Sequence, residues 1–93
     1  RPLPKYPSVM RDISILVDKT AKVGEIMQTI QETDLKYIED VDLIDEFEYE
    51  GKRSLTFRII FQAEDRTLTD KEVNREMDKM TAVLKRKFGA EVR

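Results

Sequence analysis

Apolar side chains alternate strictly through residues 52–63, and this pattern constrains the fold more than any other feature of the chain. The apolar positions are Leu55, Phe57, Ile59 and Phe61. Successive side chains of a strand point to opposite faces, so this segment reads as a strand with one face in a core. The sequence therefore predicts a sheet that is covered on one side and open on the other.

The preceding segments supply the rest of one hairpin and a first helix. A strand is predicted over residues 12–18, a helix over about 22–33 and a second strand over about 38–49, from period-2 and helical spacing of apolar residues. Glu50 and Gly51 form a two-residue hairpin turn in this interpretation, because glycine tolerates the positive φ that such turns require. A β-bulge near Asp42, where alternation breaks, would change the facing of the second strand.

A second helix begins at a capping box and ends at a glycine. Thr69 can accept from the amide of Glu72, whose side chain can reach back. The apolar stripe that follows is Val73, Met77, Met80, Leu84 and Phe88, and Gly89 is a natural stop. Residues 90–93 can form a short last strand. The order of elements predicts an α+β, ferredoxin-like sandwich: a four-stranded antiparallel sheet with two helices on one face.

Composition limits what such a domain can do. A chain of 93 residues forms one domain, here residues 1–93, and the proline-punctuated segment 1–7 reads as a linker cut from a longer protein. With no cysteine and no histidine, a disulfide frame, a thiolate site and a histidine base are excluded, and zinc would have only oxygen ligands. We expect no catalysis, metal or cofactor in this domain. No apolar run approaches the ~20 residues of a membrane span, so a cytoplasmic location is expected.

Charge restricts any nucleic-acid contact to a small area. The net charge is −2 and the isoelectric point about 5.2, whereas general nucleic-acid binders carry a broad basic surface. Acidic residues crowd segment 39–50 and basic residues crowd segment 79–93. This segregation fits a local RNA contact, and it equally fits a solvated strand and a solvated helix face.

The predicted hairpin register gathers a candidate site on the open face, the sheet surface that the helices leave uncovered. With a turn at residues 50–51, the directly opposed pairs are Phe47 with Ser54 and Asp45 with Thr56. The clustered residues are Asp45, Phe47, Ser54, Thr56 and Arg58. They offer a ring for stacking, groups for base edges and a guanidinium for phosphate, which suits unpaired RNA. An ordinary sheet surface, with Arg58 paired to Asp45, explains the same residues.

Other functions of this topology fit less well. The paired acids of segment 39–50 come with no sign of a pocket, and the dispersed glycines exclude an acylphosphatase anion loop. RNA-recognition motifs display aromatics on the central strands, but Phe57 and Phe61 point inward here. The alternatives kept are a regulatory ACT-like domain, which would bind a small molecule near Gly24, and a protein-interaction module.

The chain resembles the ferredoxin-fold anticodon-binding domain of bacterial phenylalanyl-tRNA synthetase β chains. The resemblance runs from about residue 6 to residue 93 and rests on five segments in order: residues 6–12 (YPSVMRD), 43–47 (LIDEF), 51–58 (GKRSLTFR), 65–70 (DRTLTD) and 88–93 (FGAEVR). It implies an α2β2 enzyme in which the α subunit uses ATP and Mg²⁺ to activate phenylalanine. The β domain would hold the anticodon loop of tRNA(Phe).

The resemblance also implies the residues that contact the tRNA. Asp45, Phe47 and Ser54 match the positions where such domains contact the anticodon, and they coincide with the register cluster. Ser8 and Arg11 complete the expected contact set, with Arg11 on phosphate. Arg66 is expected to order the turn before the second helix. Two departures are a shorter hairpin and phenylalanine in place of the commoner tyrosine at Phe47.

Overall fold

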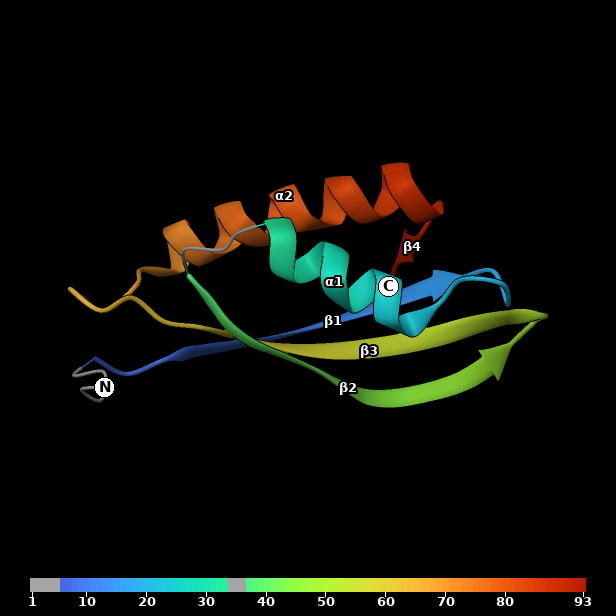
Figure 1. Cartoon of the computed structure of the whole chain (residues 1–93), viewed down its shortest axis with the longest axis horizontal. Helices are drawn as coiled ribbons and strands as arrows, with labels where there is room; N and C mark the ends of the chain where they lie inside the picture. Colours follow the sequence, from blue (N-terminus) through green and yellow to red (C-terminus); the bar gives the residue numbers. More distant parts are fainter. Residues whose placement is uncertain (1–5, 34–36) are drawn as a thin grey trace.

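The computed structural model describes residues 6–33 and 37–93, and the elements follow the predicted order (Figure 1). They are β1 (Val9–Val17), α1 (Val23–Thr33), β2 (Ile38–Tyr49), β3 (Lys52–Phe61), α2 (Asp70–Phe88) and β4 (Glu91–Val92). Strand β1 begins three residues before the predicted start, since Val9 pairs with Phe61 at the far end of β3. Most of the linker-like segment 1–7 lies outside the described residues.

The strands form one antiparallel sheet in the order β2-β3-β1-β4. Both helices lie on the same side of this sheet in Figure 1, which leaves the other side open. The ferredoxin-like prediction is therefore confirmed. Strands β2 and β4 are the two edges, so side chains from opposite edges can meet only across the open face or through the helical layer.

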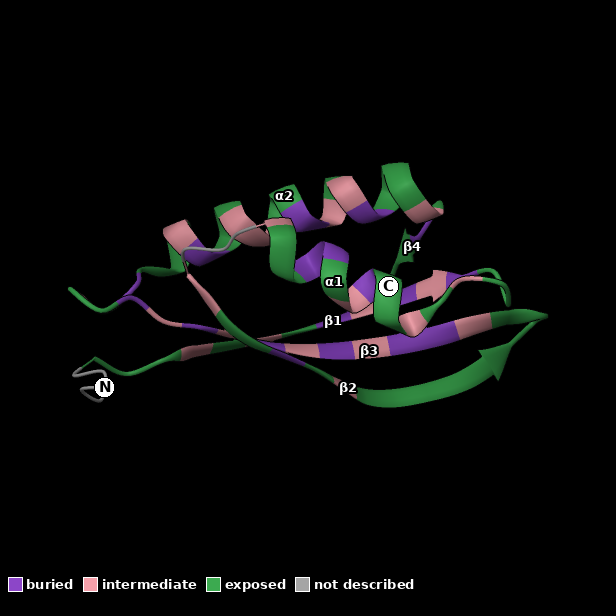
Figure 2. Cartoon of the chain, viewed as in Figure 1, coloured by how far each residue is buried: buried purple, intermediate pink, exposed green. Residues whose placement is uncertain are grey.

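The alternation in β3 buries the predicted residues against the helices (Figure 2). Leu55, Phe57, Ile59 and Phe61 are all 0% exposed. They pack with Ile15 of β1 and with residues of both helices in one core cluster. Truncating a ring such as Phe57 to alanine typically costs about 3–5 kcal/mol, because the cavity cannot fully collapse.

The ends of α2 follow the predicted signals. The Thr69 side chain accepts from the Glu72 amide at 3.1 Å, and the Thr69 amide donates to the Glu72 carboxylate at 3.1 Å. Arg66 bonds the same carboxylate and also the Tyr37 hydroxyl at 3.1 Å, so it orders the preceding turn as expected. Gly89 closes the helix with φ of +62°, a left-handed conformation that favours glycine.

The β2–β3 hairpin turns at the predicted residues. Glu50 and Gly51 have φ values of +51° and +80°, as two-residue hairpin turns require. The register shifts between Leu43 and Asp45, close to the bulge predicted at Asp42, and shifts again between Ile38 and Asp40. From Ile44 onward β2 is exposed along its whole length, which Figure 2 shows as a strand end that neither helix covers.

Candidate nucleic-acid interface

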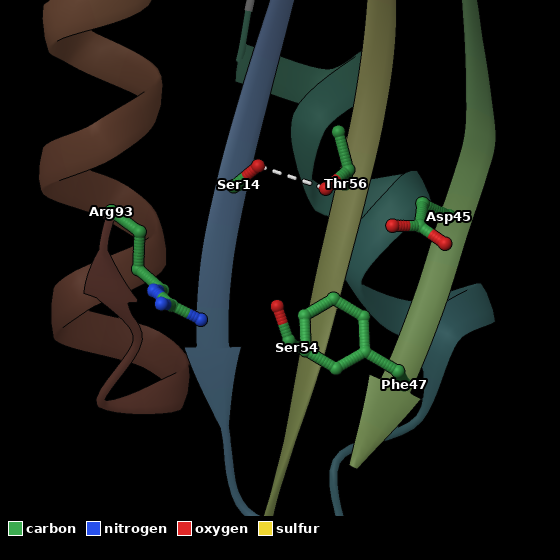
Figure 3. A pocket seen from close by; sticks show the side chains of 6 residues that line it. All are labelled: Ser14, Asp45, Phe47, Ser54, Thr56 and Arg93. Atoms are coloured by element: carbon green, nitrogen blue, oxygen red, sulfur yellow. Dashed lines mark hydrogen bonds between the residues drawn. The ribbon is translucent and has the colours of Figure 1, made fainter. Parts of the chain in front are cut away.

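A hollow of about 330 Å³ lies on the open face, near the hairpin end of the sheet (Figure 3). Its lining residues, which define "the hollow" below, are Ser14, Asp45, Phe47, Ser54, Thr56 and Arg93. They come from three strands and from the residue after the fourth: Ser14 from β1, two residues each from β2 and β3, and Arg93 from the position after β4. The structure thus brings together four of the predicted site residues.

The hairpin register explains why these side chains meet. Phe47 opposes Ser54 and Asp45 opposes Thr56, both as predicted from the turn. Thr56 in turn opposes Ser14 of β1. Directly opposed residues share a face, so alternation sends all of them to the open side. Leu43 and Asp45 are two positions apart and would point to the same side of a regular strand. The bulge between them lets Leu43 pack on the helix side while Asp45 points to the open face.

The polar groups of the hollow differ in how they are engaged. Ser14 and Thr56 share a hydrogen bond of 2.8 Å between their hydroxyls, drawn as the dashed line in Figure 3. The side chains of Asp45 and Ser54 have no hydrogen-bond partner among the residues that the structure describes. A carboxylate accepts hydrogen bonds and a hydroxyl both donates and accepts, so two unengaged groups remain for a ligand with N–H donors and acceptors on one edge.

Phe47 provides the aromatic surface of the hollow. Its side chain is 47% exposed, although it lies on a strand of a folded sheet. An aromatic face of this kind stacks on any nucleic-acid base, because every base has a π face. The ring can therefore stack on a flat heterocycle, and the neighbouring carboxylate of Asp45 and hydroxyl of Ser54 can contact the edge of that heterocycle.

Arg93 is a site residue that the sequence reasoning missed. Its main-chain N–H donates to the Ser14 carbonyl at 2.9 Å, and its guanidinium lies 4.6 Å from the centre of the Tyr49 ring. Residues 90–93 are predicted as a strand, but no local turn sets the register of this strand against residues 12–18. The charge pattern only counts Arg93 among the basic residues of segment 79–93, so its place opposite Ser14 could not be predicted.

Arg58 reaches the open face but not the hollow. Its Nε and Nη2 donate to the two carboxylate oxygens of Asp12 at 3.0 and 3.1 Å. This hydrogen bonding lowers the pKa of Asp12 and raises the pKa of Arg58. The expected alternative pairing of Arg58 with Asp45 is wrong, because Asp45 stands opposite Thr56 and the residue opposite Arg58 in β2 is Asp42.

Arg11 and Ser8 also lie away from the hollow. Arg11 shares the facing of Ile13, which is the helix side, and its Nη2 donates to Asp70 at the start of α2 at 3.2 Å. Ser8 is exposed just before β1, six positions from Ser14, which corresponds to about 20 Å along a strand. The structure therefore does not gather these two residues with the rest of the predicted set.

Two further places on the surface differ from the hollow in what they could bind. A second hollow of about 300 Å³ lies between the helices, where Lys87 bonds the buried Thr29 hydroxyl at 3.2 Å. Gly24, the candidate for a small-molecule site, is exposed, and an added Cβ there would meet nothing within 4 Å.

Residues 6–33 and 37–93 contain no group of acidic side chains arranged to hold a metal ion. None of the helices in these ranges is long and apolar enough to cross a membrane.

Comparison with known proteins points to one family. The family model of the ferredoxin-fold anticodon binding domain matches residues 4–93. Phenylalanine–tRNA ligase beta subunits of Clostridium tetani and Bacillus cereus are 41% and 39% identical, over 98% of this chain and 12% of each of those proteins. The chain thus spans about an eighth of the length of these relatives.

A solved structure gives independent support for the fold. The de novo designed protein Foldit4 is similar with a TM-score of 0.57 and 20% identity, over 94% of each chain. At that identity the likeness concerns the fold alone. The family match covers nearly the whole sequence, and the chain therefore belongs to the ferredoxin-fold anticodon-binding domain family.

Proposed function

We propose that this chain binds the anticodon loop of tRNA(Phe), as the C-terminal domain of a phenylalanine–tRNA ligase β subunit. One observation carries the proposal: an exposed ring, an unengaged carboxylate and an unengaged hydroxyl converge in the hollow of an anticodon-binding family member. Anticodon bases are unpaired, so their faces can stack and their edges can be hydrogen-bonded. The open face offers both kinds of contact in one place.

In this proposal each residue of the hollow has a defined role. Phe47 stacks on one anticodon base. Asp45 accepts a hydrogen bond from an N–H on the edge of that base, and Ser54 makes a second edge contact. Thr56, held by Ser14, keeps the floor of the hollow rigid and polar. Base-edge contacts of this kind confer sequence preference, whereas phosphate contacts mainly position the RNA.

The chemistry of aminoacylation takes place elsewhere in the proposed enzyme. The α subunit of an α2β2 assembly activates phenylalanine with ATP and Mg²⁺ in the cytoplasm, and this domain contributes only to tRNA recognition. Because the hollow is small and the net charge is −2, the domain depends on contacts made by the rest of the enzyme. Those contacts raise its effective concentration at the anticodon.

A binding titration tests the proposal directly. RNA stem-loops carrying the tRNA(Phe) anticodon and an altered anticodon are titrated with the 93-residue chain, and phenylalanine is titrated by calorimetry in parallel. We expect tighter binding to the first RNA and none to phenylalanine. Specific micromolar binding of phenylalanine without RNA binding would support the ACT-like alternative instead. Phenylalanine-dependent pyrophosphate exchange by the chain alone would contradict the assignment of chemistry to the α subunit.

A further inference from the structure

Arg93 and Tyr49 meet across the open face from opposite edges of the sheet. Tyr49 ends the edge strand β2, and Arg93 directly follows the other edge strand, β4. Three strand spacings separate these edges, about 14 Å, a gap that only two long side chains can bridge. The guanidinium nevertheless lies 4.6 Å from the Tyr49 ring centre. Figure 3 shows the Arg93 side chain extending from the end of β4 to the edge of β1, in the direction of Ser54.

We propose that Arg93 binds the phosphodiester of the nucleotide whose base occupies the hollow, and that Tyr49 is a positioning residue that holds the guanidinium there. This inference rests on the proposed function and adds the backbone contact that it lacks. Arg93 supplies the one cationic side chain among the six residues that line the hollow. The two arginines expected to hold the backbone are otherwise engaged: Arg58 with Asp12 and Arg11 with Asp70.

Position favours a phosphate over a base as the partner of Arg93. A base that stacks on Phe47 and contacts Asp45 lies over the β2–β3 side of the hollow. In this proposal its sugar and phosphate lie toward β1 and β4, on the side from which Arg93 enters the hollow. Glu91 shares the open side of β4, but Glu91 and Arg93 form no ion pair in the described part of the chain. The guanidinium therefore keeps its charge available for an anion.

The stacking geometry explains how Tyr49 can hold Arg93 without occupying its donors. A guanidinium stacked on a ring presents its flat face to the ring, while its five N–H donors point outward in its own plane. Those donors suit two phosphate oxygens at once. A side chain that is already placed loses less conformational freedom on binding. The cation–π contact thus prepares Arg93 for phosphate instead of competing with it.

The test measures binding of the chain to a labelled anticodon stem-loop by fluorescence anisotropy over a range of salt concentrations. Arg93→Gln should weaken binding and reduce the salt slope by about 0.7, the value for one phosphate contact to a single strand. Tyr49→Leu should weaken binding about two- to fivefold, the worth of an exposed cation–π contact. Tyr49→Phe, which keeps the ring, should bind like the unmodified chain.

Two comparisons separate positioning from other effects. In the Arg93→Gln background, Tyr49→Leu should have no further effect, because the side chain that Tyr49 holds is gone. Arg75→Gln is the matched charge control, since Arg75 is exposed on α2, away from the open face. It should leave the affinity and the salt slope nearly unchanged. Thermal unfolding of each variant checks that the fold is retained.

The outcomes distinguish this inference from the proposed function. If Phe47→Ala weakens binding while Arg93→Gln preserves the affinity and the slope, the phosphate contact is wrong and the anticodon site stands. If Tyr49→Leu weakens RNA binding equally in the unmodified chain and in the Arg93→Gln background, Tyr49 does not position Arg93. If Phe47→Ala and Arg93→Gln both bind as well as the unmodified chain, the hollow is not the RNA site and both proposals fail.

Discussion

Phe47 and Ser54 face each other directly across β2 and β3, and Ser54 is only 3% exposed while the ring beside it is 47% exposed. The pair therefore places an exposed ring beside a serine that is nearly buried. In the proposed complex, a base stacked on the ring contacts the serine hydroxyl with its edge. This arrangement couples stacking, which is indifferent to sequence, with an edge contact, which is not.

Removing the ring should weaken binding to every RNA sequence. Phe47→Ala should cost about 1–3 kcal/mol of binding free energy, the usual value for one aromatic platform. Phe47→Tyr should bind at least as well, because it keeps the platform and adds a hydroxyl that can donate a hydrogen bond. Anisotropy titrations with cognate and altered stem-loops provide the measurement. Ile44→Ala removes an exposed apolar side chain from β2 outside the hollow and serves as the control.

Loss of either edge contact should instead reduce discrimination between anticodons. Asp45→Asn and Ser54→Ala should each narrow the difference in binding free energy between cognate and altered stem-loops by about 1 kcal/mol, the net worth of one hydrogen bond. Asp42→Asn makes the same charge change on β2 outside the hollow and should leave this difference unchanged. Unaltered discrimination in both hollow variants would mean that these groups do not read the base.

Contacts between residues close in sequence could be predicted, and contacts between distant residues could not. A local turn at Glu50 and Gly51 determines the β2–β3 register, so the pairing of Phe47 with Ser54 could be predicted. The β1–β3 register has no such local signal. The alternative pairing of Arg58 with Asp45 was therefore wrong, because Asp12 reaches Arg58 through a pairing between strands that are far apart in sequence.

The contact of Arg11 with Asp70 could not be predicted, and the polarity of β1 near its start gives no hint of it. Met10 is apolar yet 54% exposed on the open side, while the charged Arg11 turns toward the helices. Asp70 at the start of α2 offers Arg11 a hydrogen-bond partner on that side. Alternation extended back from Ile13 puts Arg11 on the helix side, but the pattern does not show its partner, because Asp70 is distant in sequence.

Arg11 should consequently contribute less to RNA binding than Arg93. Arg11→Gln should leave the salt slope of stem-loop binding nearly unchanged, because its guanidinium lies on the helix side beside Asp70. The measurement is the same salt titration, with both variants compared at matched concentrations. A slope change for Arg11→Gln as large as that for Arg93→Gln would support the phosphate contact expected from the family resemblance. It would also require RNA to extend beyond the open face.

Acid should selectively remove the contribution of Glu72 to stability. Hydrogen bonds from Arg66 and from the Thr69 amide lower the pKa of Glu72 from an ordinary 4.5 to about 2. A carboxylate with a lowered pKa in the folded state stabilises the fold above pH 4.5, and this stabilisation disappears as the pH falls toward 2. Glu72→Gln should therefore lower the melting temperature at pH 7 but hardly at pH 2. A difference that persists undiminished at pH 2 would contradict this.

The chain alone should bind tRNA weakly, and the complete enzyme should bind far more tightly. Its net charge is −2, and β2 carries acidic side chains beside the hollow, so long-range attraction to RNA is small. We expect a dissociation constant in the micromolar range or weaker at physiological salt, since few phosphates are contacted. Deleting the domain from the β subunit should nevertheless reduce charging strongly. The covalent link to the rest of the enzyme holds the domain at a high effective concentration beside the anticodon, so even weak contacts count. Binding of the 93-residue chain and charging by the enzyme with and without it are the two measurements. Nanomolar binding by the chain alone would show that the hollow is only part of a larger RNA surface.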